Sequence, residues 1–259
     1  FKHINFSVSV YSLLSPFSLV LSAQVAAIPL SRVTLNALVD PLRREIGATM
    51  KFQEGRGDNC RIDINGTVAL GNHLLTIKDL KAVTGDSTLF VTGTVQNCFS
   101  SPLIGRFNIN SPSFVIGEIL PCLKVFRDIG KTNLGDEEDG GEEGGLLHLL
   151  DIKVDADLSF DHITYKNVNI SNVEASCEIS KDVFKLSSLE GDLGDGSIQL
   201  NGFFREGTTE PEYGFSLTGK ELNLVSLVSA LFPEFEGEVG GITDLTFELT
   251  GSGTTKESL

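Results

Sequence analysis

Apolar and polar residues alternate along most of this chain, which is the pattern of β-strands that bury one face. The clearest case is the stretch 151–160, in which every even position is apolar and every odd position is polar. The same alternation runs through 61–70 and 245–250, and Gly, Asn or Asp residues punctuate the segments between such stretches. This spacing predicts roughly fifteen short strands, joined mostly as antiparallel hairpins.

The chain also contains an internal repeat, because residues 77–96 return in recognisable form as residues 186–205. The positions that recur are Leu80, Gly85, Asp86 and Gly93 in the first copy and Leu189, Gly194, Asp195 and Gly202 in the second. Repeats of this kind arise from stacked units that bury a shared apolar face only when their neighbours are present. We therefore expect two equivalent units.

Three short stretches have the i, i+3, i+4, i+7 apolar spacing of a helix. They are Leu35, Leu38, Val39 and Leu42; Ile116, Ile119, Leu120 and Leu123; and Leu224, Leu227, Val228 and Leu231. Each is interrupted or ended by a proline, at positions 41, 121 and 233. We expect these pieces to cap one end of each unit.

The predicted fold class is mainly β, an elongated curved antiparallel sheet with a few short amphipathic helices. Each strand has one apolar face, which must be covered by a second sheet, closed into a barrel or curled into a trough; the repetition favours the trough or a sandwich. The residues predicted to line a groove are Ile62, Ile64, Val68, Leu89, Val91, Phe107, Ile109, Ile152, Val154, Leu158, Phe160, Phe184, Leu186, Ile198, Leu200, Phe215, Leu217, Leu245 and Phe247.

The expected organisation is a first repeat unit over 1–129, an acidic Gly-rich linker over 130–147 and a second unit over 148–259. The linker carries six carboxylates between positions 136 and 143, whose mutual repulsion, together with the many glycines, opposes folding. The spacing of these carboxylates does not fit a calcium loop. We interpret the 259-residue chain as a segment of a longer repeat protein.

Composition narrows the choice of partner. The net charge of −15 argues against nucleic acid, which requires clustered Lys and Arg. The most apolar stretch, 13–30, contains two prolines and several polar residues, so it predicts strands and no membrane span. The four cysteines form no CxxC pair. Their spacing is compatible with free thiols and with one or two disulfides.

No catalytic constellation is present in the sequence. The four histidines lie in unrelated contexts, and no nucleophile elbow, zinc-protease or phosphate-loop motif occurs. The turn at Gly194 and Asp195 has a counterpart at Gly85 and Asp86, so turn chemistry explains both. We expect no enzyme activity, no catalytic residue, no metal and no cofactor.

Three segments resemble the C-terminal region of the AsmA family of Gram-negative bacteria: 183–202, 213–231 and 241–253. They contain a strand, a Gly-Asp-Gly turn, a strand ending in glycine, a short apolar helix and a strand closing on Leu-Thr-Gly-Ser-Gly. The similarity extends from about 152 to 255 and, more loosely, from 61 to 123. The acidic insert at 136–143 departs from the family pattern.

The resemblance implies a repeating β-groove that moves phospholipid between the inner and outer membranes and maintains the outer membrane. It also implies a periplasmic location and an inner-membrane anchor outside this segment, and it carries over no catalytic residues. The partners expected are therefore phospholipid acyl chains. The alternative is a structural or adhesive cell-surface β-repeat protein with a dry core, and a sandwich-like carbohydrate-active enzyme ranks third.

Deleting residues 136–143 should change the free energy of unfolding by less than ~1 kcal/mol, as surface changes usually do. Thermal unfolding with and without calcium measures this. A large loss of melting temperature, or stabilisation by calcium, would contradict the assignment of this run as a linker.

Overall fold

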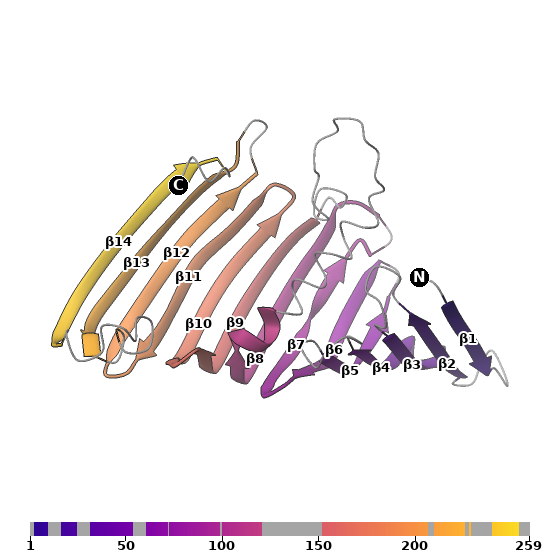
Figure 1. The fold of residues 1–259 in the computed structure, drawn as a ribbon. Helices are drawn as coiled ribbons and strands as arrows, with labels where there is room; N and C mark the ends of the chain where they lie inside the picture. Colours follow the sequence, from indigo (N-terminus) through magenta and orange to yellow (C-terminus); the bar gives the residue numbers. More distant parts are fainter. Residues whose placement is uncertain are drawn as a thin grey trace.

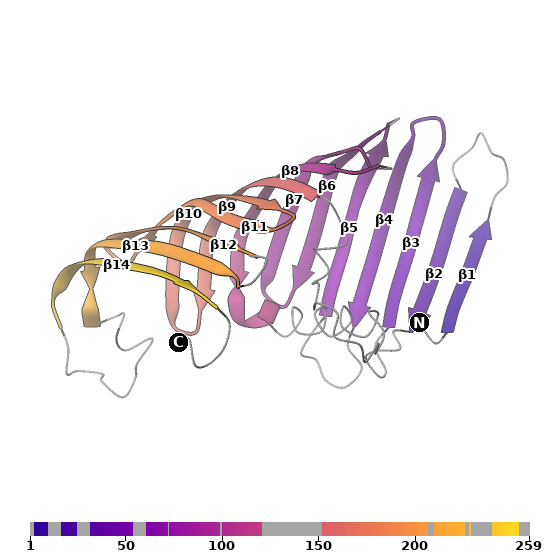
Figure 2. The same cartoon turned by 90° about the horizontal axis from the view of Figure 1, so that it is seen from above.

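The fold is one continuous β-sheet whose strands follow each other in chain order (Figure 1). The computed structural model describes residues 3–9, 17–24, 32–53, 61–71, 73–98, 100–120, 152–206, 210–225, 228 and 240–253. The acidic run lies outside these residues. The prediction of a mainly β, curved and open sheet with few helical residues is confirmed (Figures 1 and 2).

The sheet has 14 strands. Their bounds are β1 His3–Ser9, β2 Phe17–Gln24, β3 Arg32–Asp40, β4 Glu45–Gln53, β5 Arg61–Leu70, β6 Leu74–Thr84, β7 Ser87–Gln96, β8 Leu103–Val115, β9 Ile152–Tyr165, β10 Val168–Ser180, β11 Val183–Leu193, β12 Gly196–Arg205, β13 Glu212–Asn223 and β14 Ile242–Ser252. The strands of both predicted repeat units belong to this one sheet.

One pair of neighbouring strands departs from the antiparallel prediction. β8 and β9 run parallel, with Leu103 opposite Ile152 and Val115 opposite Thr164, whereas every other pair is antiparallel. A parallel pair needs a connection of a dozen or more residues, because the chain must return to the end of the sheet at which the first strand began. The segment 116–151 between these strands is long enough. The connection 224–241 is also long but joins the antiparallel pair β13 and β14, and the other connections in the sheet are short.

The helical predictions have different outcomes. Residues 116–120 are helical, as are residues 224, 225 and 228, so the second and third predictions hold where the structure describes them. The first prediction, over 35–42, is wrong because this stretch forms β3 and a turn. Its sequence also alternates with period two, and pairing with β2 and β4 decides the outcome, leaving Leu38 56% exposed.

The internal repeat is also present in the strand register. The pairing of β6 with β7 shifts between Ile77 and Leu80, and the pairing of β11 with β12 shifts between the equivalent Leu186 and Leu189. Each pair of residues is three apart yet points to the same face, because a bulge inserts one extra residue into the alternation. The hairpin turns are equivalent as well, with positive φ of 54° at Gly85 and 64° at Gly194.

The sheet forms a single layer. Extensive contacts between the described strands run only between sheet neighbours, so no second sheet of described residues packs against either face. Figure 2 shows the layer from above, with β1–β5 running in nearly the same direction and β13 and β14 lying across it. Within the described residues the sandwich alternative is therefore excluded, and the open curved sheet remains.

The helical turn after β8 is attached to the hairpin between β6 and β7 through Glu118. Its carboxylate accepts hydrogen bonds from the backbone N–H of Asp86 at 2.9 Å and of Ser87 at 3.1 Å, and from the Ser87 hydroxyl at 2.8 Å. The Ser87 hydroxyl oxygen in turn accepts from the backbone N–H of Val115. One carboxylate thus fixes the end of β8 to a neighbouring turn.

Replacing Glu118 by Ala should lower the free energy of unfolding by about 1–3 kcal/mol, because it leaves the nearly buried donors of Ser87 without their acceptor. The midpoint of urea unfolding measures the loss. Replacing the exposed Glu190 by Ala is the matched control and should stay within about 0.5 kcal/mol of the parent. Equal effects of the two substitutions would contradict this role of Glu118.

Candidate functional site: an uncovered apolar face

The pairing register places a continuous set of apolar residues on one face of β3–β14. Residues directly opposite each other in neighbouring strands project from the same face of a sheet. Following these pairs from strand to strand gives two complete rows. The first row is Ala37, Ala48, Gly66, Leu80, Val91, Ile109, Leu158, Ala175, Leu189, Leu200, Leu217 and Phe247. The second row is Val39, Ile46, Val68, Ile77, Gly93, Phe107, Ala156, Cys177, Leu186, Gly202, Phe215 and Leu249.

We call the face that carries these two rows the apolar face. Ten of the groove residues predicted from the sequence are members of the rows. The other nine lie two or four residues further along the same strands and project from the same side: Ile62, Ile64, Leu89, Ile152, Val154, Phe160, Phe184, Ile198 and Leu245. The register thus brings all of the predicted groove residues onto one surface.

The two rows of the apolar face are free of charge. Neither row contains an Asp, Glu, Lys or Arg residue. Charges gather on the opposite face, where Arg106 pairs with Asp155 at 3.9 Å on neighbouring strands. Other ion pairs on that polar face are Lys153 with Glu178, Arg205 with Glu212 and Arg61 with Asp63. The two faces therefore have opposite chemical character along the described sheet.

The buried side chains of the described sheet lie on the apolar face. The buried side chains are Ala37, Ala156, Phe160, Val173, Leu222, Ser87 and Ser111, and the register assigns each of them to the apolar side. Local packing shields several of them: Phe114 stacks on Phe160, and Glu118 of the helical turn covers Ser87. The face remains open, since Phe184, Phe215 and Phe247 are 38–46% exposed.

Each row crosses 12 of the strands in the hydrogen-bonding direction. Neighbouring strands lie ~4.8 Å apart, so each row extends over about 50 Å. The apolar face is thus a strip many times longer than one side chain.

Two glycines of the second row lie where the neighbouring strand approaches closely, since the atoms nearest to an added Cβ would be the backbone oxygens of Arg106 and Gly214 at 2.3 and 2.8 Å. A Cβ atom on Gly93 would lie 2.7 Å from Cδ1 of Phe107, and one on Gly202 would lie 2.9 Å from Cβ of Phe215. Both distances are too short for a real side chain. The two glycines are equivalent in the repeat and each faces its phenylalanine across the sheet, so the recurrence of glycine has a packing reason.

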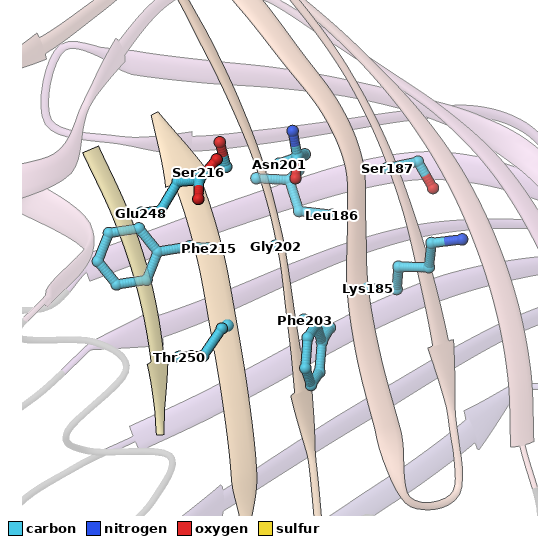
Figure 3. Close-up of a pocket in the computed structure, with 11 residues that line it drawn as sticks. Lys185, Leu186, Ser187, Asn201, Gly202, Phe203, Phe215, Ser216, Glu248 and Thr250 are labelled. Atoms are coloured by element: carbon cyan, nitrogen blue, oxygen red, sulfur yellow. The ribbon is translucent and has the colours of Figure 1, made fainter. Parts of the chain in front are cut away.

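Two shallow hollows lie on the polar face of the described strands. The first, of about 310 Å³, is lined by Lys185, Asn201, Phe203, Ser216 and Glu248 among others (Figure 3). The second is lined by Glu174, Glu190 and Asp192 together with Lys220.

Among the described residues, no group of His, Cys, Asp or Glu side chains is arranged to hold a metal ion. His73 and His162 are exposed and lie on separate parts of the sheet.

Cys177 lies in the second row, between Ala156 and Leu186. Partial burial raises the pKa of its thiol above the ordinary value, and the negative charge of Asp157 raises it further. Cys98 and Cys177 are both free thiols, whereas Cys60 and Cys122 lie outside the described residues. Cys177 is therefore a natural reporter in the middle of the apolar face.

Sequence reasoning missed several members of the rows. Leu80 and Leu189 recur in the repeat, but strict alternation from Ile77 and Leu186 assigns them to the polar side. Ala37 and Ala48 are small and gave no clear signal in the pattern of apolar positions. Ala37 also fell within a predicted helix. The three-residue spacing between Ile77 and Leu80, repeated between Leu186 and Leu189, was the sequence signal that could have indicated a bulge.

In comparisons with known proteins, no family model, curated protein or solved structure matches the chain. In the part of the chain that the structure describes, no helix is both long enough and apolar enough to span a membrane. The candidate site therefore depends on the geometry of the apolar face.

Alkylation of Cys177 should require a higher pH than alkylation of the same thiol in the unfolded chain, because only the thiolate reacts and the folded protein raises the pKa. The pH dependence of iodoacetamide modification tests this in a variant whose other three cysteines are replaced by Ser. Asp157→Asn should shift the profile part of the way toward lower pH. A profile that coincides with that of the unfolded chain would contradict the placement of Cys177.

Proposed function

We propose that this protein is a non-enzymatic carrier of lipid acyl chains, and that the apolar face is the surface along which the chains lie. The observation that carries the proposal is a charge-free strip about 50 Å long that no described layer covers. Ordinary globular proteins bury such a surface under a second layer. A single-layer sheet with this face open is suited to an apolar ligand.

Acyl chains fit this surface energetically. Each buried CH₂ group contributes about 0.8 kcal/mol, so a chain that leaves water for the strip gains free energy along its whole length. The strip is continuous from strand to strand, with no charged side chain in either row to oppose a sliding chain. Headgroups would remain at the rim in contact with water.

The resemblance to the AsmA family supports the same proposal and makes it more specific. It suggests phospholipid as the cargo, transfer between the inner and outer membranes as the process, and outer-membrane homeostasis as the role. It also suggests the periplasm as the location and attachment to the inner membrane. These points extend the proposal beyond lipid binding itself.

The alternative is a structural or adhesive repeat protein with a dry core. A dry core requires a layer that covers the apolar face, and the described residues contain no such layer. The alternative therefore predicts a wild-type protein without bound lipid. Detergent-free purification followed by mass spectrometry of extracted lipids distinguishes the two.

Charges introduced on the apolar face should abolish lipid binding. We expect Leu200→Glu and Phe215→Arg to retain little of the lipid that copurifies with the parent, because an unpaired charge in an apolar environment is strongly disfavoured. An open face lets the charged group reach water, so we expect the circular dichroism spectrum to stay like that of the parent.

Matched controls lie one residue away on the polar face. Asn201→Glu and Ser216→Arg introduce the same charges into the same strands and should leave lipid binding unchanged. Equal loss of lipid in all four variants, or a wild-type protein that never carries lipid, would contradict the proposed function.

A further inference from the structure

Three exposed phenylalanine side chains gather at one margin of the sheet, where β11 begins and β12 ends (the upper margin in Figure 1). Phe184, Phe203 and Phe204 are 43, 39 and 44% exposed. Phe184 lies directly opposite Phe204 across the strand pair. Both strands have a paired neighbour on either side, so the cluster lies within the sheet. We call these three residues the aromatic tip.

The aromatic tip occupies both faces of the sheet. Phe184 and Phe204 lie on the apolar face, next to its second row. Phe203 projects from the polar face, where Lys185 lies opposite it (Figure 3). Its ring extends across β13, because a Cβ atom on Gly214 would lie 2.7 Å from Cε1 of Phe203. A surface for acyl chains on the apolar face therefore accounts for two of the three rings and leaves Phe203 unexplained.

The first copy of the repeat shows that the fold does not require these rings. The equivalent residues, in the same strand register, are Leu75, Val95 and Thr94. In place of Gly214, over which the ring of Phe203 lies, the first copy has Arg106. Both copies nevertheless form the same strand pairs with the same bulge. The aromatic tip is thus specific to the second copy and has a reason other than folding.

The surroundings of the aromatic tip carry little net charge. Three basic and four acidic residues lie in the described strand ends and turns beside it: Lys181, Lys185, Arg205, Asp182, Glu206, Glu210 and Glu212. Arg205 pairs with Glu212 at 3.1 Å, and its guanidinium lies 5.8 Å from the centre of the Phe203 ring. Attraction to an anionic surface requires an excess of positive charge, which is absent here. Binding at the tip must therefore come from burial of apolar surface.

We propose that the aromatic tip inserts into the surface of a phospholipid bilayer. A bilayer surrounds whatever enters it, so it covers Phe203 on one face of the sheet together with Phe184 and Phe204 on the other. A protein partner docked on either face of this single layer would leave the opposite side exposed. Aromatic rings favour the membrane interface, and the long side chains of Lys185 and Arg205 can extend to the headgroups.

Insertion at this margin brings the open apolar face into contact with the bilayer. Phe184 lies opposite Ile179 of β10, which lies opposite Val154 of β9. An acyl chain that leaves the bilayer at the tip therefore meets further apolar side chains on the neighbouring strands. This path rests on the proposed function, whereas the insertion depends only on the tip itself.

Flotation with vesicles of phosphatidylcholine alone tests the insertion in the unmodified chain. We expect the chain to float with the vesicles equally well at low and high salt, because apolar burial is not screened. Vesicles of equal parts phosphatidylcholine and phosphatidylglycerol should bind no more strongly. A chain that floats with neither composition, or only with the anionic vesicles at low salt, would overturn the proposal.

Substitution by the residues of the first copy tests the aromatic tip, and these residues already occupy equivalent strand positions in this fold. Phe184→Leu, Phe203→Thr and Phe204→Val together should weaken vesicle binding about tenfold or more, since less apolar surface is buried in the bilayer. Phe203→Thr alone should weaken it about fivefold. Binding of Phe203→Thr equal to that of the parent would overturn the proposal, because it would show that the apolar face alone contacts lipid.

Phe90 provides the matched control. It is also a phenylalanine on the polar face, 43% exposed and opposite Lys81, and its counterpart in the second copy is Gln199. Phe90→Gln should leave vesicle binding unchanged. A loss as large as that of Phe203→Thr would overturn the assignment of binding to the tip.

A gain of signal tests the same point without relying on a loss of binding. The chain contains no tryptophan, so Phe203→Trp introduces a single fluorescent reporter at the tip. Its emission should shift to shorter wavelength when phosphatidylcholine vesicles are added, whereas that of Phe90→Trp should not. The absence of a shift at position 203, or equal shifts at both positions, would overturn the proposal.

The outcome is separate from that of the proposed function. A chain that carries copurified lipid and does not float with vesicles overturns the insertion alone. A chain that floats through its aromatic tip and never carries lipid contradicts the proposed function alone.

Discussion

An extended apolar surface in water is the constraint on which the rest of this structure depends. Each Å² of apolar surface removed from water contributes about 25 cal/mol, and a single-layer sheet leaves much of that contribution unused on its exposed side. Packing between neighbours recovers part of it, because side chains such as Phe160 and Val173, which are opposite each other on β9 and β10, are buried on the apolar face. The remainder is available to a ligand.

The strand register maintains this surface. A slip of one residue in any strand would transfer its apolar side chains to the charged face, so each hairpin must keep the register across the sheet. Where the alternation breaks, a bulge restores it, as between Ile77 and Leu80 and at the equivalent point between Leu186 and Leu189. Ile170 and Val173 provide another case, because both contact the position that a Cβ of Gly191 would occupy.

Much of this architecture could be predicted from the sequence because it depends on local alternation. The apolar positions of β9 follow from a strict two-residue period, and the hairpin glycines Gly85 and Gly194 follow from turn chemistry. The helix expected over 35–42 failed because two periodicities coexist there and pairing with neighbouring strands decided between them.

Features that depend on distant residues were not predictable in this way. Nothing local to β8 or β9 distinguishes parallel from antiparallel pairing. A long connection permits the parallel pair but does not decide it, since the long connection 224–241 joins the antiparallel pair β13 and β14. The attachment of Glu118 to the turn at Ser87 joins residues far apart in the sequence. The apolar face was found as a set of positions, but its continuity through Leu80, Ala175 and Leu189 required the register.

The most direct test of the central claim is photo-cross-linking along the apolar face. A photoreactive amino acid would replace Val91, Leu158 or Leu217, one in each variant, with Thr92, Ser159 and Thr218 as neighbouring positions on the polar face. Irradiation in the presence of phospholipid vesicles, followed by mass spectrometry, should give lipid adducts at all three apolar positions and none at the polar ones. Adducts at neither set, or equally at both, would contradict the account.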